Sequence, residues 1–180
     1  MPTIEVSVNG TSIALAGGEG FDLLSLSVLS SQDHADAVVL LTGRKQTDEI
    51  IQWLNTRVMR GDKVTIVLRR GGAATTVPDA LPSWRVQGNN GADQSKSSQS
   101  TASLFIVRYG GHVARVSADS TGTLMVTAAW NPLYGKCKLE MTRLSKQDSD
   151  LNRCWIEFSV DFDEPALIEI GRNPAPDLSY

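Results

Sequence analysis

The sequence predicts an all-β protein, or nearly so, built from two tandem homologous modules, each an antiparallel β-sandwich or small barrel, that form a pseudo-twofold pair. Three observations lead to this prediction. Residues 4–30 align without gaps on residues 104–130, short runs of alternating apolar and polar residues recur, and turn residues separate these runs about every 8 to 12 positions. The expected domains are a first β repeat (1–84), a flexible linker (85–102) and a second β repeat (103–180).

The internal alignment depends on a nearly constant spacing between similar residues. At an offset of 100 the matched residues include Ile4/Leu104, Val6/Ile106, Gly10/Gly110, Ala14/Ala114 and Leu24/Leu124. At an offset of 102 the matched residues include Trp53/Trp155 and Ile66/Ile168. Because self-similarity at a fixed spacing is typical of repeated structural units, we expect the two halves to share one strand order.

Each repeat is expected to open with a hairpin. Residues 3–8 and 12–16 flank Asn9-Gly10, the dipeptide most typical of a two-residue hairpin turn, and Tyr109-Gly110-Gly111 forms the turn in the second repeat. The further strands expected lie at 23–29, 37–42, 53–58 and 63–69, and at 123–130, 136–142, 155–160 and 166–170.

Residues 44–59 allow two interpretations. Ile50, Ile51, Leu54 and Val58 have helical spacing, which favours an amphipathic helix. The matching residues 155–160 instead alternate as a strand does. Since homologous repeats share a fold, we expect a strand from Trp53 to Val58.

The linker and the charge distribution indicate two similar modules within the chain. Residues 85–102 contain one large apolar residue, Val86, among Ser, Gln, Gly, Asn and Ala, a composition that buries too little to become ordered. Residues 1–84 carry 7 Lys and Arg against 9 Asp and Glu, and residues 103–180 carry 8 against 10. Neither half is therefore a basic arm.

Composition excludes several classes of function. A net charge of −3 disfavours nucleic-acid binding, and no apolar run reaches the length of a membrane span. Two Cys and two His are too few for a disulfide scaffold or a clear zinc site, so no metal or cofactor is expected. No secretory signal begins the chain, which favours the cytoplasm. No catalytic residues stand out, and we expect a protein that is not an enzyme.

Aromatic residues outside the matched pattern are the candidate contact residues. Trp130, Leu133 and Tyr134 surround a proline, and the first repeat has no counterpart, so this segment resembles an interaction hot spot. The alternative is packing within the chain. The repeats end in similar segments, Pro78-Asp79-Ala80-Leu81-Pro82-Ser83-Trp84 and Pro176-Asp177-Leu178-Ser179-Tyr180. We expect Trp84 and Tyr180 to anchor these tails against a module.

The function expected is non-catalytic binding of a protein partner, in the manner of an immunity protein or an adaptor. The alternative is a small-ligand or carbohydrate binding protein with one site per repeat. The two repeats share apolar positions and turns but no polar cluster, which favours the protein contact. A homo-oligomer is compatible with this interpretation.

Overall fold

The computed structural model describes residues 2–31, 36–71, 103–117, 123–131, 135–144 and 156–172. Within these ranges the backbone forms twelve β-strands and no helix, which confirms the all-β prediction. No described segment is a helix that could cross a bilayer.

Residues 2–70 and 103–172 each contribute six strands. The strands of the first half are β1 (Pro2–Val8), β2 (Thr11–Gly17), β3 (Phe21–Ser31), β4 (Asp36–Lys45), β5 (Ile50–Met59) and β6 (Lys63–Arg70). The strands of the second half are β7 (Ser103–Tyr109), β8 (His112–Ser117), β9 (Thr123–Asn131), β10 (Lys136–Leu144), β11 (Ile156–Val160) and β12 (Pro165–Arg172).

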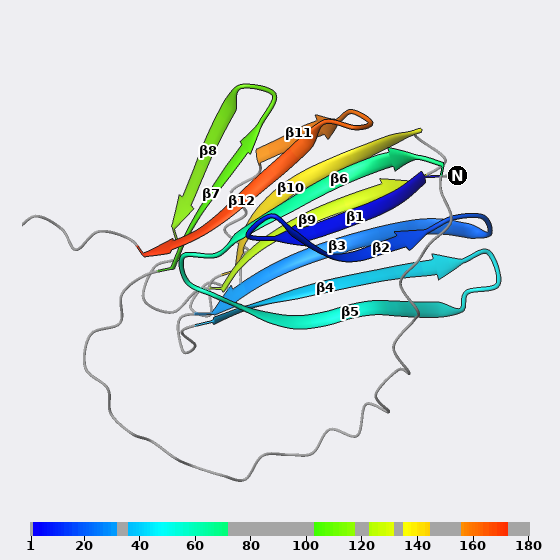
Figure 1. Ribbon diagram of the computed structural model, residues 1–180, viewed down its shortest axis with the longest axis horizontal. Helices are drawn as coiled ribbons and strands as arrows, with labels where there is room; N and C mark the ends of the chain where they lie inside the picture. The colour runs from blue at the N-terminus through cyan, green and yellow to red at the C-terminus, as the bar shows by residue number, and fades with distance from the viewer. Residues whose placement is uncertain are drawn as a thin grey trace, which may run out of the picture.

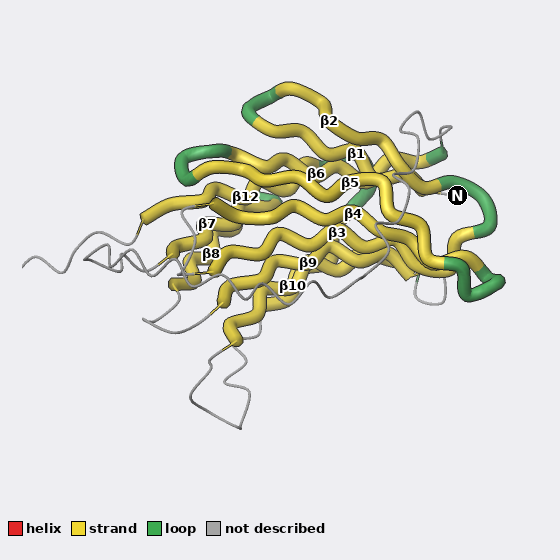
Figure 2. The backbone as a smooth tube through the Cα atoms, turned by 90° about the horizontal axis from the view of Figure 1, so that it is seen from below, coloured by secondary structure: helices red, strands yellow, loops and turns green. Residues whose placement is uncertain are grey.

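The twelve strands form two antiparallel sheets that pack face to face (Figures 1 and 2). Sheet A has the order β2-β1-β6-β12-β7-β8, and sheet B has the order β11-β10-β9-β3-β4-β5. Each half of the chain therefore supplies three adjacent strands to each sheet. The halves meet where β6 pairs with β12 and where β3 pairs with β9.

Alternation of side chains explains the strands and the core. In β4, Ala37, Val39 and Leu41 are fully buried, while the residues between them are half-buried on the outer face. Buried residues of both sheets form one continuous cluster, as expected when two half-apolar sheets cover each other. The core includes Ile4, Leu26, Leu68, Phe105, Leu139 and Ile168.

The strand expected at residues 53–58 is confirmed, because Ile50–Met59 forms β5 at the edge of sheet B. The helical spacing of its apolar residues therefore does not reflect a helix. Trp53 is 4% exposed and packs on Phe21, with ring centroids 4.9 Å apart.

The gap-free alignment does not agree with the burial pattern of the first strand in each half. It pairs buried Ile4 and Val6 with Leu104 and Ile106, but those residues are only half-buried, and the buried positions of β7 are Phe105 and Val107. The cause is local: the pairing of β1 with β2 shifts register between Val6 and Ser7, whereas that of β7 with β8 is regular. Matching the two halves by strand pairing gives an offset of 101 before this irregularity and of 100 after it.

Two reciprocal backbone hydrogen bonds join the halves. The amide of Gly61, in the turn before β6, donates to the carbonyl of Ile170 at 2.7 Å. The amide of Asp163, in the turn before β12, donates to the carbonyl of Leu68 at 2.8 Å. Both turn residues have positive φ, at 97° and 63°. Each half thus closes its last turn on the last strand of the other.

Candidate functional site

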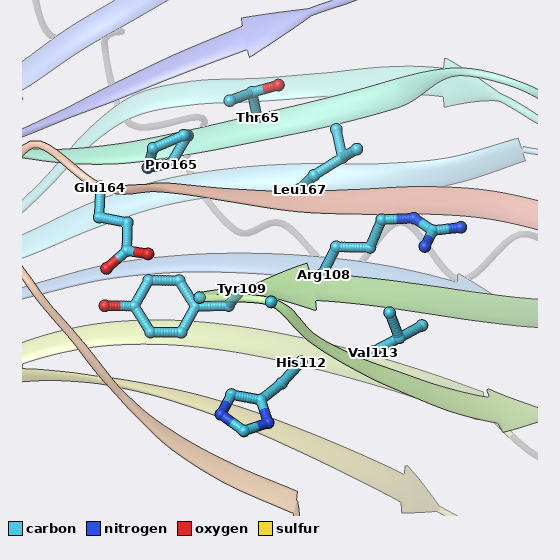
Figure 3. Close-up of a pocket in the computed structure, with 10 residues that line it drawn as sticks. Thr65, Arg108, Tyr109, His112, Val113, Glu164, Pro165 and Leu167 are labelled. Atoms are coloured by element: carbon cyan, nitrogen blue, oxygen red, sulfur yellow. The ribbon is translucent and has the colours of Figure 1, made fainter.

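The candidate site is an open depression of about 660 Å³ on the outer face of sheet A, at the β7–β8 turn. We call it the β8 depression. Its lining residues come from β6, β7, β8, β12 and two turns (Figure 3): Thr65, Arg108, Tyr109, Gly110, Gly111, His112, Val113, Glu164, Pro165 and Leu167.

The two-residue turn shapes this end of the sheet. Gly110 and Gly111 have φ values of 53° and 78°, which are typical of the tight type I′ turn and which glycine adopts without strain. Figure 1 shows the β7–β8 hairpin turned steeply away from the direction of the neighbouring strands. The depression lies on the sheet surface next to this turn.

The floor of the depression is a row of residues that crosses four strands. Thr65 pairs with Leu167, Leu167 pairs with Arg108, and Arg108 pairs with Val113. Directly opposed residues in antiparallel strands point to the same face, so all four side chains lie on the outer surface. Val113 is 49% exposed, one of the most exposed large apolar side chains in the described part of the chain.

Tyr109 fixes the hairpin to the neighbouring turn. Its hydroxyl accepts a hydrogen bond from the Asp161 amide at 2.6 Å and also hydrogen bonds to the Glu164 carboxylate. Burial raises the pKa of Tyr109, the Asp161 amide partly offsets that rise, and Glu164 adds to it. The hydroxyl is therefore neutral at neutral pH and serves to hold the turn. Figure 3 shows the Glu164 carboxylate beside the Tyr109 ring.

Positive charge exceeds negative charge on this part of sheet A. The Oε1 atom of Glu169 lies 3.6 Å from the Nε of Arg108 and 3.8 Å from the Nζ of Lys63. Arg115, on the same face of β8, is exposed, and the described residues provide no carboxylate within 4 Å of it. Two cations thus flank the Glu169 carboxylate, and Arg115 adds a third cation on the same face, two strands away from Glu169.

Ion pairs cover another part of the outer face of sheet A, around Arg69 on β6. Arg69 lies 2.7 Å from Glu5 and 3.3 Å from Asp163, measured between guanidinium nitrogens and carboxylate oxygens. The hydrogen bond to Glu5 is the main cause that raises the pKa of Arg69. Nearby, the guanidinium of Arg70 lies 4.8 Å from the centre of the Phe162 ring.

Trp130, the predicted contact residue that the structure describes, does not line this depression. Trp130 is 6% exposed and packs in the core, because β9 continues through Asn131 and the expected loop begins later. Its indole Nε1 is buried without a hydrogen-bond partner. Leu133 and Tyr134 lie outside the described residues, so a contact by residues 130–134 stays a prediction.

Other predictions also fall outside the described residues. Trp84, Tyr180 and the linker 85–102 are among them. Of the two cysteines, Cys154 is outside, while Cys137 is buried with a free thiol. The described residues contain no group of His, Cys, Asp and Glu that could hold a metal ion.

The β8 depression was not predicted from the sequence, because its lining residues come from separate segments and form no recognisable motif. The available signal was Val113, an apolar residue at an outward-facing position of the edge strand, two residues before Arg115.

Comparison with known proteins adds no functional assignment, since no family model, curated protein or solved structure matches the chain.

Proposed function

We propose that this chain is an internally duplicated β-sandwich that binds another protein without catalysis, through the surface around the β8 depression. The observation that carries the proposal is the exposed apolar side chain of Val113 on an open surface that half-buried Leu167 also lines, with Arg108 between them. Exposed apolar surface rimmed by polar groups is typical of protein contacts, whereas small ligands need a pocket that encloses them.

The strand order supports the duplication. Reading outward from the β6–β12 pair, sheet A has β1 then β2 on one side and β7 then β8 on the other. Reading outward from the β3–β9 pair, sheet B has β4 then β5 and β10 then β11. The two halves therefore follow one order of strands around a common axis, as a duplicated unit would.

The registers support it as well. Ser27 pairs with Thr127, with hydroxyl oxygens 3.5 Å apart, and this pair has the offset of 100 found in the sequence. Thr65 pairs with Leu167 at the offset of 102. A twofold axis through two antiparallel copies of one strand brings equivalent residues face to face, and both central pairs meet this condition.

The outer face of sheet A has diverged between the halves. The row of paired residues Ser12–Ser7–Thr65 continues as Leu167–Arg108–Val113, so position by position Thr65 corresponds to Leu167 and Ser12 to Val113. In the next row Glu5 corresponds to Ile106, whereas Leu15 corresponds to Arg115. Three polar positions of the first half are thus apolar in the second, and one apolar position has become cationic.

The proposal that the protein is not an enzyme is supported by the structural contacts that the polar groups of the depression make. The Tyr109 hydroxyl is engaged by Asp161 and Glu164, and Arg108 by Glu169. These groups hold turns and strands together. A cytoplasmic location is part of the proposal and is supported by the free thiol of Cys137.

The test is capture of a partner by the immobilised chain from a lysate of its native host. Val113→Glu is expected to abolish retention of the captured protein, because it places a charge in the apolar contact. Ser12→Glu is the matched control, since it changes the corresponding position of the other half and should retain the partner. Equal retention by both variants would contradict a contact at the β8 depression. Absence of any captured partner, together with binding of a carbohydrate, would contradict protein binding altogether.

A further inference from the structure

β8 is the last strand of sheet A, and among the described residues no strand lies on the other side of its backbone. The turn between Tyr109 and His112 has two residues, so these flanking residues form a hydrogen-bonded pair across the hairpin. Hydrogen-bonded and non-hydrogen-bonded pairs alternate along an antiparallel ladder. The amide and carbonyl groups of Val113 and Arg115 therefore point away from β7, toward the open edge.

The β8 depression adjoins this edge. Val113 contributes to its lining, and Leu167 and Arg108 lie on the same cross-strand row. A chain extended along β8 would place every second side chain on the outer face. The side chain opposite Val113 would then lie next to the apolar floor of the depression.

The charges near this edge indicate which side chains an added strand would carry. On the outer face, Arg115 lies on the edge strand and Arg108 on the neighbouring strand, and Glu169 lies between Arg108 and Lys63 on the next two strands. The carboxylate that lines the depression itself, that of Glu164, is hydrogen bonded to Tyr109 at the turn. An acidic side chain opposite Arg115 would supply the counter-charge that the described residues do not give this arginine, since opposite charges on directly paired residues stabilise a sheet.

We infer that β8 accepts an extended segment of the partner protein as an additional antiparallel strand, an inference that rests on the proposed function. The added strand runs opposite to β8, so its residue facing Arg115 precedes by two its residue facing Val113. The segment recognised has the pattern acidic-x-apolar. Main-chain hydrogen bonds to the open edge supply affinity, and the two side chains supply specificity.

A second copy of this chain fits the edge poorly. Pairing β8 with β8 of another molecule would join two sheet faces that each carry Lys63, Arg108 and Arg115. Like charges brought onto one surface disfavour association. An arginine on an edge strand also protects against unspecific pairing, which agrees with a site that accepts only acidic segments.

The experiment selects a displayed library of random short peptides on the full chain and on three variants. Val113→Pro removes the outward amide at a position where an edge strand tolerates proline, and Ser12→Pro makes the corresponding change on edge strand β2 as the matched control. Arg115→Glu reverses the charge. Circular dichroism and melting of each variant verify that it folds, and Val113→Ala keeps the amide if Val113→Pro does not fold.

The wild-type chain and Ser12→Pro should enrich acidic-x-apolar peptides, and Val113→Pro should bind them about tenfold more weakly or worse. Arg115→Glu should enrich basic-x-apolar peptides instead. No enrichment, or a motif indifferent to Val113→Pro and Arg115→Glu, overturns the inference. A wild-type dimer that Val113→Pro dissociates would also overturn it. So would a single-stranded oligonucleotide that competes with the peptides and whose binding depends on Arg115.

The natural partner separates this inference from the proposed function. If Val113→Pro and Arg115→Glu capture the partner as well as the wild type does, strand addition is wrong and protein binding stands. If the wild type captures no partner from the host lysate, the proposed function fails, whatever the peptides show.

Discussion

The interior of the sandwich and the outer face of sheet A differ in how closely the two halves agree. Inside, Ile4 and Phe105, Val39 and Leu139, and Ile66 and Ile168 fill corresponding buried positions. Outside, the Glu5–Arg69 ion pair of the first half has no counterpart, and exposed Val113 stands where the first half has Ser12. Folding constrains the apolar volume of both halves equally, while function need constrain only one surface.

The largest effect is expected where the two halves differ inside the core. Trp130→Ala should lower the free energy of unfolding by about 3 to 5 kcal/mol, because the ring is buried and its removal leaves a cavity. The corresponding Ser30→Ala should cost only about 1 kcal/mol, the value of a typical hydrogen bond. Urea unfolding of both variants measures the difference. A loss below about 1 kcal/mol for Trp130→Ala would place the ring outside the core.

A smaller loss is expected at the aromatic pair of the first half. A Cβ atom at Gly43 would lie 2.7 Å from the Trp53 ring and 2.9 Å from the Phe21 ring, both of which are buried. Gly43→Ala should therefore destabilise the protein by about 1 to 3 kcal/mol, the usual cost of overpacking. Tryptophan fluorescence should also shift as Trp53 moves. An unchanged melting temperature would show that the rings do not close over Gly43.

The alkaline stability of the protein should depend on Cys137. Burial raises the pKa of this thiol from 9.0 to about 12. Between these pH values the thiol ionises in the unfolded chain but not in the folded one, so its contribution is present below pH 9 and is lost as pH rises, at about 1.4 kcal/mol per pH unit.

Cys137→Ala provides the comparison, because Ala37 holds the corresponding position in β4. Unfolding measured from pH 8 to pH 11 should show a shallower decline for this variant than for the wild type. Parallel declines would mean that Cys137 is accessible to water.

The smallest effect is expected at the first hairpin turn. The Asn9 side chain donates to Asp62 at 2.7 Å and accepts from the Lys63 amide at 3.0 Å, whereas the other half has Gly110 at this position. Asn9→Gly keeps the positive φ that the turn requires and removes two exposed hydrogen bonds, so it should cost about 0.5 to 1 kcal/mol. Asn9→Ala should cost more, because alanine is strained at φ 51°. The reverse order of melting temperatures would contradict this explanation of the turn.

The regular parts of the fold were predictable from sequence because they follow local rules. Period-two alternation and the Asn9-Gly10 turn located the strands, and comparison with residues 155–160 decided correctly that β5 is a strand. The irregularity between Val6 and Ser7 was not predictable, since it changes hydrogen-bond pairing without altering the apolar pattern. It shifted the alignment of the first strand by one residue.

The candidate site was hidden for a different reason. The floor of the β8 depression joins Thr65, Arg108 and Leu167, which are far apart in sequence and meet only through the pairing of β6, β12 and β7. The segment chosen from the sequence began with Trp130, because aromatic residues near a proline resemble a contact loop. Continuation of β9 through Asn131 instead places that ring in the core.

Amide hydrogen exchange with and without the captured partner tests the central claim most directly. The outward amides of Val113 and Arg115 exchange readily from an open edge and should become protected when the partner adds a strand there. The corresponding amides of β2, including that of Ser12, should be unchanged. Protection of β2 instead, or protection that avoids β8, would contradict the account.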